Sequence, residues 1–199
     1  MKTPKNKIIM KEKIPQIIDY LKENLKPSRF THTMGVREEA VKLARKYGAD
    51  IEKAEIAALV HDCCKNKTDS ELICLADTLG VKLDKFQLAN GKLLHAPVGA
   101  AFAKKYFGIE DSEIIDAVTY HTTGRADMTL LDKIIYLADY IDPNRDDFEG
   151  LATLRTLTYE NLDKAMLYAL ELSEEHVRSK GAPLHPDTVS AIAYFKKSI

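Results

Sequence analysis

The 199-residue chain is 45% hydrophobic and 30% charged, and its formal net charge is −1. A chain of this length and composition is expected to form one globular domain with a substantial hydrophobic core. The near-zero charge argues against a nucleic-acid polymer or an anionic membrane as the partner, although a local basic site for a small anion stays open.

The sequence also lacks the marks of a membrane-spanning or secreted protein. No stretch approaches the roughly 20 apolar residues of a membrane-spanning helix, and residues 1–10 lack the apolar segment of a secretory signal. Cys63, Cys64 and Cys74 are an odd number of cysteines and do not suggest a disulfide framework. We therefore expect a cytoplasmic protein.

Four helices are predicted before residue 80. The first two carry apolar faces formed by Ile14, Ile17, Ile18 and Leu21 and by Val36, Ala40, Val41, Leu43 and Ala44. The third covers residues 49–63, where Asp50 can cap the first turn and Ile51 faces inward. The fourth begins with Thr68 and Glu71, which have the capping-box spacing.

Five more helices are predicted after residue 90. Their ranges are about 93–107, 112–121, 129–141 and 158–180, followed by a helix that begins at Pro186 and carries Val189, Ile192 and Ala193. The sequence has no alternating strand pattern, internal repeat or flexible linker. We predict an all-α, single-domain bundle of about nine helices over residues 12–198, preceded by an N-terminal extension of residues 1–11.

Six polar residues stand where a charge or an imidazole needs a partner: His32, His61, Asp62, His95, His121 and Asp139. His61 and Asp62 directly follow the apolar run AALV, and Asp139 lies among apolar residues of its helix. Burying such a carboxylate alone is costly, so Asp139 could equally be a buried ion pair with Arg or Lys. Each histidine alone could be a solvated or satisfied helix-end residue. Because bundles build metal sites from side chains on facing helices, the six together predict a metal site.

The donor types narrow the choice of metal. Imidazole and carboxylate suit divalent iron, manganese, zinc or nickel. Six groups exceed what one tetrahedral ion needs, so two ions fit, with Asp62 as the bridge. Such a site can bind a phosphate and generate hydroxide for in-line attack on phosphorus.

The order of these residues resembles the HD-domain superfamily of metal-dependent phosphohydrolases. A His is followed 29 residues later by the doublet His61-Asp62 and then by a downstream Asp, and the extra His95 and His121 resemble the two-metal subset. Six segments resemble the YqeK-type branch of symmetrical bis(5′-nucleosyl)-tetraphosphatases: RFTHTMGV, AALVHDCCKN, LLHAPVGA, TYHTTGR, KIIYLADYIDPNR and GAPLHPDT. The resemblance covers residues 12 to 198.

This resemblance implies an iron-containing site and hydrolysis of diadenosine tetraphosphate to two ADP by metal-activated water. One or two divalent ions are expected, and manganese or another divalent metal stays open. The principal metal would be held by His32, His61, Asp62 and Asp139, and the second by His95, His121 and Asp62. The implied catalytic residues are Asp62, Lys65 and Arg145.

The resemblance also implies a set of substrate contacts: His32, Lys65, His95, His121, Thr122, Thr123, Asp139, Arg145, Pro183, Leu184 and His185. Simpler explanations exist for several of them. Lys65 could be solvated, Thr122 and Thr123 could cap a turn, and His185 could cap the last helix. The rival partners of Arg145 are Asp142, Asp146 and Asp147.

The aromatic residues Tyr120, Tyr136, Tyr140 and Phe148 are expected in the core, and His176 is expected to be structural. The expected ligand is a small nucleotide, a dinucleoside polyphosphate with an ADP or GDP type of product. A homodimer stays open. Three alternative functions also stay open: a nucleotidase, an alarmone hydrolase and a nucleotide sensor with slow turnover.

Overall fold

The computed structural model describes residues 12–199, and all regular secondary structure in that range is helical. Its eleven α-helices and one 3₁₀ turn are α2 (Lys13–Asn24), α3 (Pro27–Tyr47), α4 (Ile51–Val60), α5 (Asp69–Leu79), α6 (Lys85–Ala89), η1 (Gly91–Leu93), α7 (His95–Tyr106), α8 (Ser112–Tyr120), α9 (Leu130–Ile141), α10 (Leu151–Glu160), α11 (Leu162–Ser179) and α12 (Pro186–Ser198). The predicted all-α class is confirmed. The expected extension lies outside the described residues, and the domain boundaries stay a prediction.

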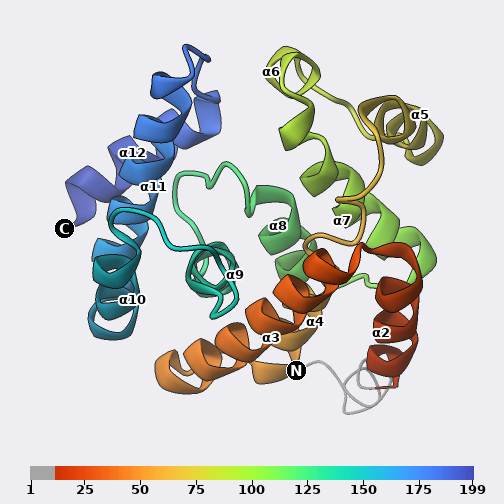
Figure 1. Cartoon of the computed structure of the whole chain (residues 1–199), viewed down its shortest axis with the longest axis horizontal. Helices are drawn as coiled ribbons and strands as arrows, with labels where there is room; N and C mark the ends of the chain where they lie inside the picture. Colours follow the sequence, from red (N-terminus) through yellow and green to blue (C-terminus); the bar gives the residue numbers. More distant parts are fainter. Residues whose placement is uncertain (1–11) are drawn as a thin grey trace.

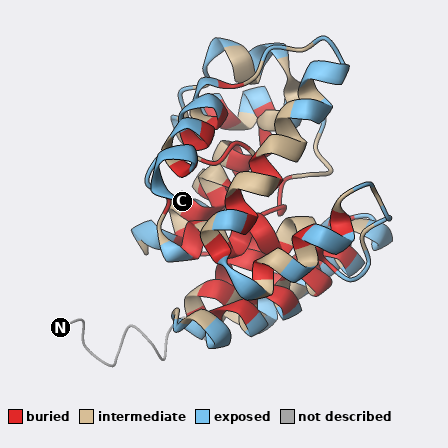
Figure 2. Ribbon diagram, turned by 90° about the vertical axis from the view of Figure 1, so that its left-hand side faces the viewer, coloured by how far each residue is buried: buried red, intermediate tan, exposed pale blue. Residues whose placement is uncertain are grey.

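The helices are arranged around α9, which lies near the centre of Figure 1. Helix α3 packs against α4 and α9, and α8 packs against α4, α7 and α9. On the far side of α9, helix α11 packs against α9, α10 and α12. Figure 2 shows the buried residues gathered where these helices meet. Helices from distant parts of the sequence therefore converge at the end of α4.

The core helices explain this arrangement. Helix α4 is buried from Ile56 to Val60, and α9 buries Ile134 to Ala138 without interruption. Helices that are apolar on most faces must be covered on most sides, which places them in the interior. None of the described helices is both long and apolar enough to cross a membrane.

The predicted long helix over residues 158–180 is α11, but it begins at Leu162 and not at Thr158, and the separate helix α10 before it was not predicted. The chain leaves helical geometry at Asn161 (φ −151°, ψ 109°), which separates α10 from α11 and places Thr158 in α10. The side chain of Asn161 accepts a hydrogen bond from the backbone N–H of Lys164 and caps α11. The short helix α6 was also missed, although Asp84 and Gln87 form a capping box at its start.

Three residues expected on apolar faces are exposed, namely Ile51, Val189 and Ala193. Ile51 is the first residue of α4 and is 40% exposed. Val189 is 51% exposed because α12 buries a different face, formed by Thr188, Ala191, Ile192 and Phe195. Those four positions have the spacing i, i+3, i+4 and i+7, so the predicted face was rotated by one residue.

Candidate metal centre

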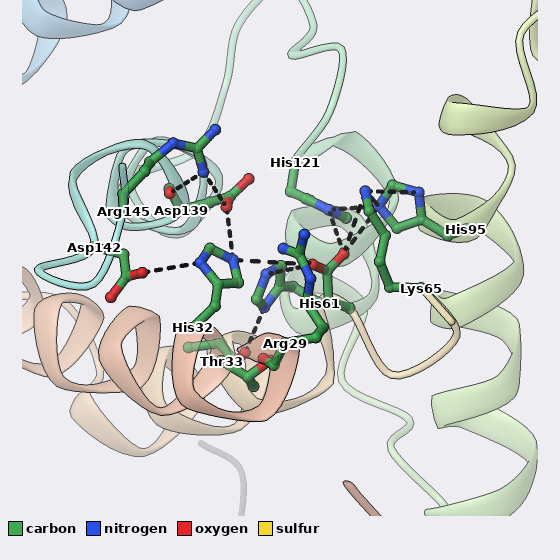
Figure 3. Close-up of polar contacts among 12 residues, drawn as sticks. Arg29, His32, Thr33, His61, Lys65, His95, His121, Asp139, Asp142 and Arg145 are labelled. Carbon is green, nitrogen blue, oxygen red and sulfur yellow. Dashed lines mark hydrogen bonds and ion pairs between the residues drawn. The ribbon is translucent and has the colours of Figure 1, made fainter. Parts of the chain in front are cut away.

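The six predicted ligands converge in one buried cluster, although they come from five parts of the fold. His32 lies in α3, His61 and Asp62 directly follow α4, and His95 begins α7; His121 directly follows α8, and Asp139 lies near the end of α9. Figure 3 labels the four histidines and Asp139, whose side chains point toward one another. The four histidines and Asp62 are at most 9% exposed, and the Asp139 side chain is 19% exposed.

Two histidines are oriented by the helix ends that they follow. The Nδ1 atom of His61 lies 2.6 Å from the carbonyl oxygen of Ala58, and the Nδ1 atom of His121 lies 2.7 Å from that of Val118. The last carbonyls of a helix have no partner within it, so each can accept this bond. A carbonyl only accepts, so Nδ1 carries the proton and Nε2 presents its lone pair to the cluster.

His32 is oriented by a residue far away in the sequence. Its Nδ1 donates to Oδ2 of Asp142 at 3.0 Å, and the Asp142 side chain is fully buried. Asp142 can approach α3 this closely because position 35 is glycine: a Cβ there would overlap Asp142 Oδ1. The Nε2 atom of His32 therefore faces the cluster, 3.0 Å from Asp139 Oδ1.

The two carboxylate oxygens of Asp62 face different halves of the cluster. Oδ2 lies 3.4 Å from Nε2 of His61 and 3.9 Å from that of His32. Oδ1 lies 3.0 Å from Nε2 of His95 and 3.6 Å from that of His121. This is the arrangement that a carboxylate bridging two positions would need.

Without a metal, the cluster is organised by charge. Burial would raise the pKa of Asp62, but the nearby side chains of His61, Lys65 and His121 hold it well below its usual value. Burial alone would lower the pKa of His32. The carboxylates of Asp139 and Asp142 outweigh burial and raise this pKa to about 9.

The His95 imidazole has the opposite shift. Burial lowers the pKa of His95 to about 4, against the opposing effect of Asp62. Its ring is therefore neutral near pH 7, which is the form that binds a metal.

The donor set fits a divalent metal. In two sets of three residues, one possible ligand atom of each residue lies within 4.8 Å of those of the other two. One set is His32, His61 and Asp139, and the other is His61, Asp62 and His121. Within residues 12–199, His32 Nε2, His61 Nε2 and Asp62 Oδ1 are buried without a well-aligned hydrogen-bond partner.

The contact between His95 and His121 also favours a bound cation. The Nε2 atoms of His95 and His121 lie 3.1 Å apart. Two imidazole lone pairs repel at this distance unless a proton or a metal lies between them. A cation would bind both.

Cationic side chains lie at both ends of the cluster. At the His95 end, Lys65 Nζ lies 3.0 Å from His95 Nε2, and in the middle Arg29 donates to Asp62 Oδ2 at 2.9 Å. At the other end, Arg145 donates to the backbone oxygen of Asp139 at 2.9 Å and lies 3.2 Å from its Oδ1. All three cationic side chains are about one third exposed, so they remain accessible to an anion.

The structure answers the rival explanations for Arg145 and Thr123. Arg145 pairs with Asp139 and not with the three alternatives Asp142, Asp146 and Asp147. The hydroxyl of Thr123 donates to the Gly124 carbonyl, and the Thr123 carbonyl accepts from Thr188 in α12, so Thr123 secures the turn after α8. Thr122 lies in the same turn and is partly exposed.

The 181–188 loop is held to Asp84 before α6 and to the turn after α8. His185 is 7% exposed; its Nε2 donates to Asp84 Oδ2 at 2.9 Å, and its Nδ1 accepts from the backbone N–H of Asp187. It caps α12, as the simpler explanation held. Pro183 is exposed and Leu184 is partly buried. A nucleotide contact of His185 would have to replace one of these bonds.

Sequence reasoning missed Arg29 as a cluster residue and Asp142 as the partner of His32. Arg29 precedes His32 by three positions on α3, and this spacing puts both side chains on one helix face. That signal was present. Asp142 is 110 positions from His32, and the sequence has no signal for their contact.

Comparisons with known proteins point to one family. The HD domain family model matches residues 29–144. A symmetrical bis(5′-nucleosyl)-tetraphosphatase of Halalkalibacterium halodurans is 40% identical over 175 residues, 87% of this chain and 91% of that protein. The protein of the same name from Bacillus subtilis is 40% identical over 84% of this chain and 89% of its own length.

A solved structure has the same fold. The crystal structure of a predicted HD superfamily hydrolase involved in NAD metabolism, from Clostridium acetobutylicum, has a TM-score of 0.90 to this chain. Its sequence is 41% identical, and the match covers 94% of this chain and 98% of that one.

Proposed function

The chain belongs to the HD domain family, and we propose that it cleaves bis(5′-nucleosyl) tetraphosphates symmetrically into two nucleoside diphosphates. The observation that carries this proposal is Asp62, whose two oxygens face two histidine groups in the middle of a cluster with cations at both ends. The relatives that carry this activity in their names match most of the chain.

The proposal assigns the metal to the six residues of the cluster. His32, His61, Asp62 and Asp139 would hold one divalent ion, and His95 and His121, with Asp62, would hold a second. Iron is the metal that the family resemblance implies, and manganese also suits these donors. A divalent ion held there stabilises charge on phosphate oxygens and makes a water molecule more acidic.

The cationic side chains would bind the phosphates of the substrate. Arg145 lies at the Asp139 end of the cluster, Lys65 lies at the His95 end, and Arg29 contacts Asp62 between them. A polyphosphate chain bound at both ends has its middle at the cluster, which is where symmetrical cleavage occurs. Lys65 and Arg145 would also stabilise the charge that develops on the phosphates during cleavage.

Product analysis tests the proposed cleavage. Iron-loaded protein is incubated with diadenosine tetraphosphate, and the nucleotides are separated by chromatography. We expect ADP as the product. AMP with ATP, or no turnover with any divalent metal, would contradict symmetrical cleavage. Asp62→Asn should abolish turnover, whereas Asp77→Asn at an exposed site on α5 is the matched control.

The same assay separates the alternatives. Preference for nucleoside monophosphates would indicate a nucleotidase, and preference for guanosine alarmones would indicate an alarmone hydrolase. Tight nucleotide binding without product after hours would indicate a sensor. The cytoplasmic location, the homodimer and the absence of a nucleic-acid partner stay predictions, and sedimentation of the purified protein measures the oligomeric state.

A further inference from the structure

A cavity of about 710 Å³ opens beside Arg145, between the end of α9, the chain before α10, and α11. This volume is within the range of small-molecule sites, about 300–1,000 Å³. Its apolar wall is formed by Tyr140, Phe148, Tyr168 and Leu172. Tyr140 also packs against the core, as expected from the sequence, but Phe148 and His176 line this cavity and were not predicted to do so.

Arg145 joins this cavity to the metal centre. Its guanidinium contacts Asp139 of the cluster and lies 5.2 Å from the ring centre of Tyr140, which lines the cavity. A ligand whose anionic part lies at Arg145 can therefore extend an uncharged part into the cavity. The aromatic rings offer that part flat apolar surfaces.

The carboxylates that line the cavity disfavour binding of a phosphate group beyond Arg145. Glu149, Glu171 and Glu175 also line it. Glu171 lies 3.1 Å from Lys196 Nζ, which offsets its charge, but Glu149 and Glu175 are exposed carboxylates. Carboxylates repel phosphate and accept hydrogen bonds from N–H and O–H groups. The hydroxyls of a ribose and the N–H groups of a purine meet that requirement.

We propose that this cavity holds one nucleoside of the substrate, with its base against the aromatic wall and its phosphates leaving past Arg145 toward the cluster. The inference rests on the proposed function for the identity of the substrate. The inference adds the direction in which the substrate lies. It also adds the side chains that bind the nucleoside, which come from α9, α11 and the chain before α10.

Filling the cavity tests this inference. Leu172→Trp narrows the cavity without touching Arg145 or a predicted metal ligand, and Val189→Trp adds the same side chain on an exposed face of α12. Affinity for ADP and for inorganic pyrophosphate is measured by calorimetry on metal-loaded protein, together with KM for diadenosine tetraphosphate. Because stacking of a base contributes 1–3 kcal/mol, we expect Leu172→Trp to weaken ADP binding by about 5-fold to 150-fold.

Pyrophosphate affinity should not change in Leu172→Trp, and neither affinity should change in Val189→Trp. Equal ADP affinity and equal KM in the two tryptophan variants would overturn the inference. Thermal unfolding of each variant shows whether the fold is retained.

A charge change gives a second test that does not depend on packing. Glu175→Lys alters an exposed residue of the lining, and we expect it to leave pyrophosphate affinity unchanged. A rise in pyrophosphate affinity would show that phosphates occupy the cavity and would refute the proposed direction.

The two proposals can fail separately. If Leu172→Trp weakens ADP binding but the products are AMP and ATP, the cavity stands and symmetrical cleavage falls. If ADP is the product but Leu172→Trp leaves ADP affinity and KM unchanged, the function stands and the cavity inference falls.

Discussion

Replacing Asp142 with asparagine is expected to weaken metal binding, because Asp142 accepts three hydrogen bonds and an amide offers only one accepting oxygen. Oδ2 accepts from His32 Nδ1 at 3.0 Å, and Oδ1 accepts from the backbone N–H and the side-chain amide of Asn144, each at 3.1 Å. Asp142 is fully buried, so water cannot replace a lost partner.

Either orientation of the new amide breaks part of this network. If the amide oxygen faces Asn144, the amide N–H₂ faces His32 Nδ1 and favours the ring tautomer with its proton on Nε2. That proton occupies the lone pair that would face the metal. If the oxygen faces His32 instead, the N–H₂ group meets two donors of Asn144. Each outcome leaves a buried polar group without a partner, which costs about 1–3 kcal/mol.

The expected magnitude follows from the role of such partners. Changing the hydrogen-bond partner of a ligating histidine lowers metal affinity or activity about 10-fold to 100-fold, or about 1.4 to 2.7 kcal/mol. Metal affinity is measured by competition with a chelator, and turnover is measured with diadenosine tetraphosphate. Asp146→Asn, at an exposed position close by, is the control. Equal metal affinity and turnover in the two variants would refute the orienting role of Asp142.

Three further changes have defined outcomes. Gly35→Ala should lower both thermal stability and metal content, because the Cβ of the new alanine would overlap Asp142. The gain of about 1 kcal/mol in helix propensity does not offset this overlap. An unchanged melting temperature would contradict this expectation. Arg145→Ala should raise KM for diadenosine tetraphosphate about 10-fold to 100-fold, whereas Arg145→Lys should raise it less, since only the charge is kept; equal KM in wild type and Arg145→Ala would remove Arg145 from the substrate site. In metal-free protein, the pKa of His32 is raised from 6.5 to about 9, so its contribution to stability is complete below pH 6.5 and is lost as the pH rises through about 9. Melting temperatures measured across this range should fall more steeply in wild type than in His32→Gln, and parallel curves would contradict the assignment.

The fold class could be predicted because it depends on local patterns. Apolar spacing marks most of the helices, and capping residues such as Thr68 and Thr129 mark where two of them begin. The break at Asn161 could not be predicted from spacing, because the apolar positions on its two sides are close to one helical register. Its capping signal, a single Asn, is one that many helix interiors also contain.

The cluster was predictable for a different reason. A histidine or an aspartate beside an apolar run needs a partner, and His61, Asp62 and Asp139 have that position in the sequence. The residues that orient or surround the cluster do not have to lie beside an apolar run in the sequence. Asp142 looks like an ordinary residue at a helix end, and Arg29 looks like a surface cation. Their roles exist only when α3 packs against α9 and the end of α4.

The four histidines differ in how firmly the protein orients them. His61 and His121 are oriented by the carbonyls of their own helix ends, and His32 is oriented by the buried Asp142. The His95 ring instead contacts Lys65 Nζ through both nitrogens, Nδ1 at 3.3 Å and Nε2 at 3.0 Å, and Lys65 is a cation on an accessible side chain. If a polyphosphate drew Lys65 away, as the proposed function implies, His95 would lose this contact, whereas the other three rings would keep theirs. Lys65 therefore links occupancy of the phosphate site to His95 alone among the four imidazoles. Substrate binding should then affect an ion held by His95 and His121 more than one held by His32 and His61.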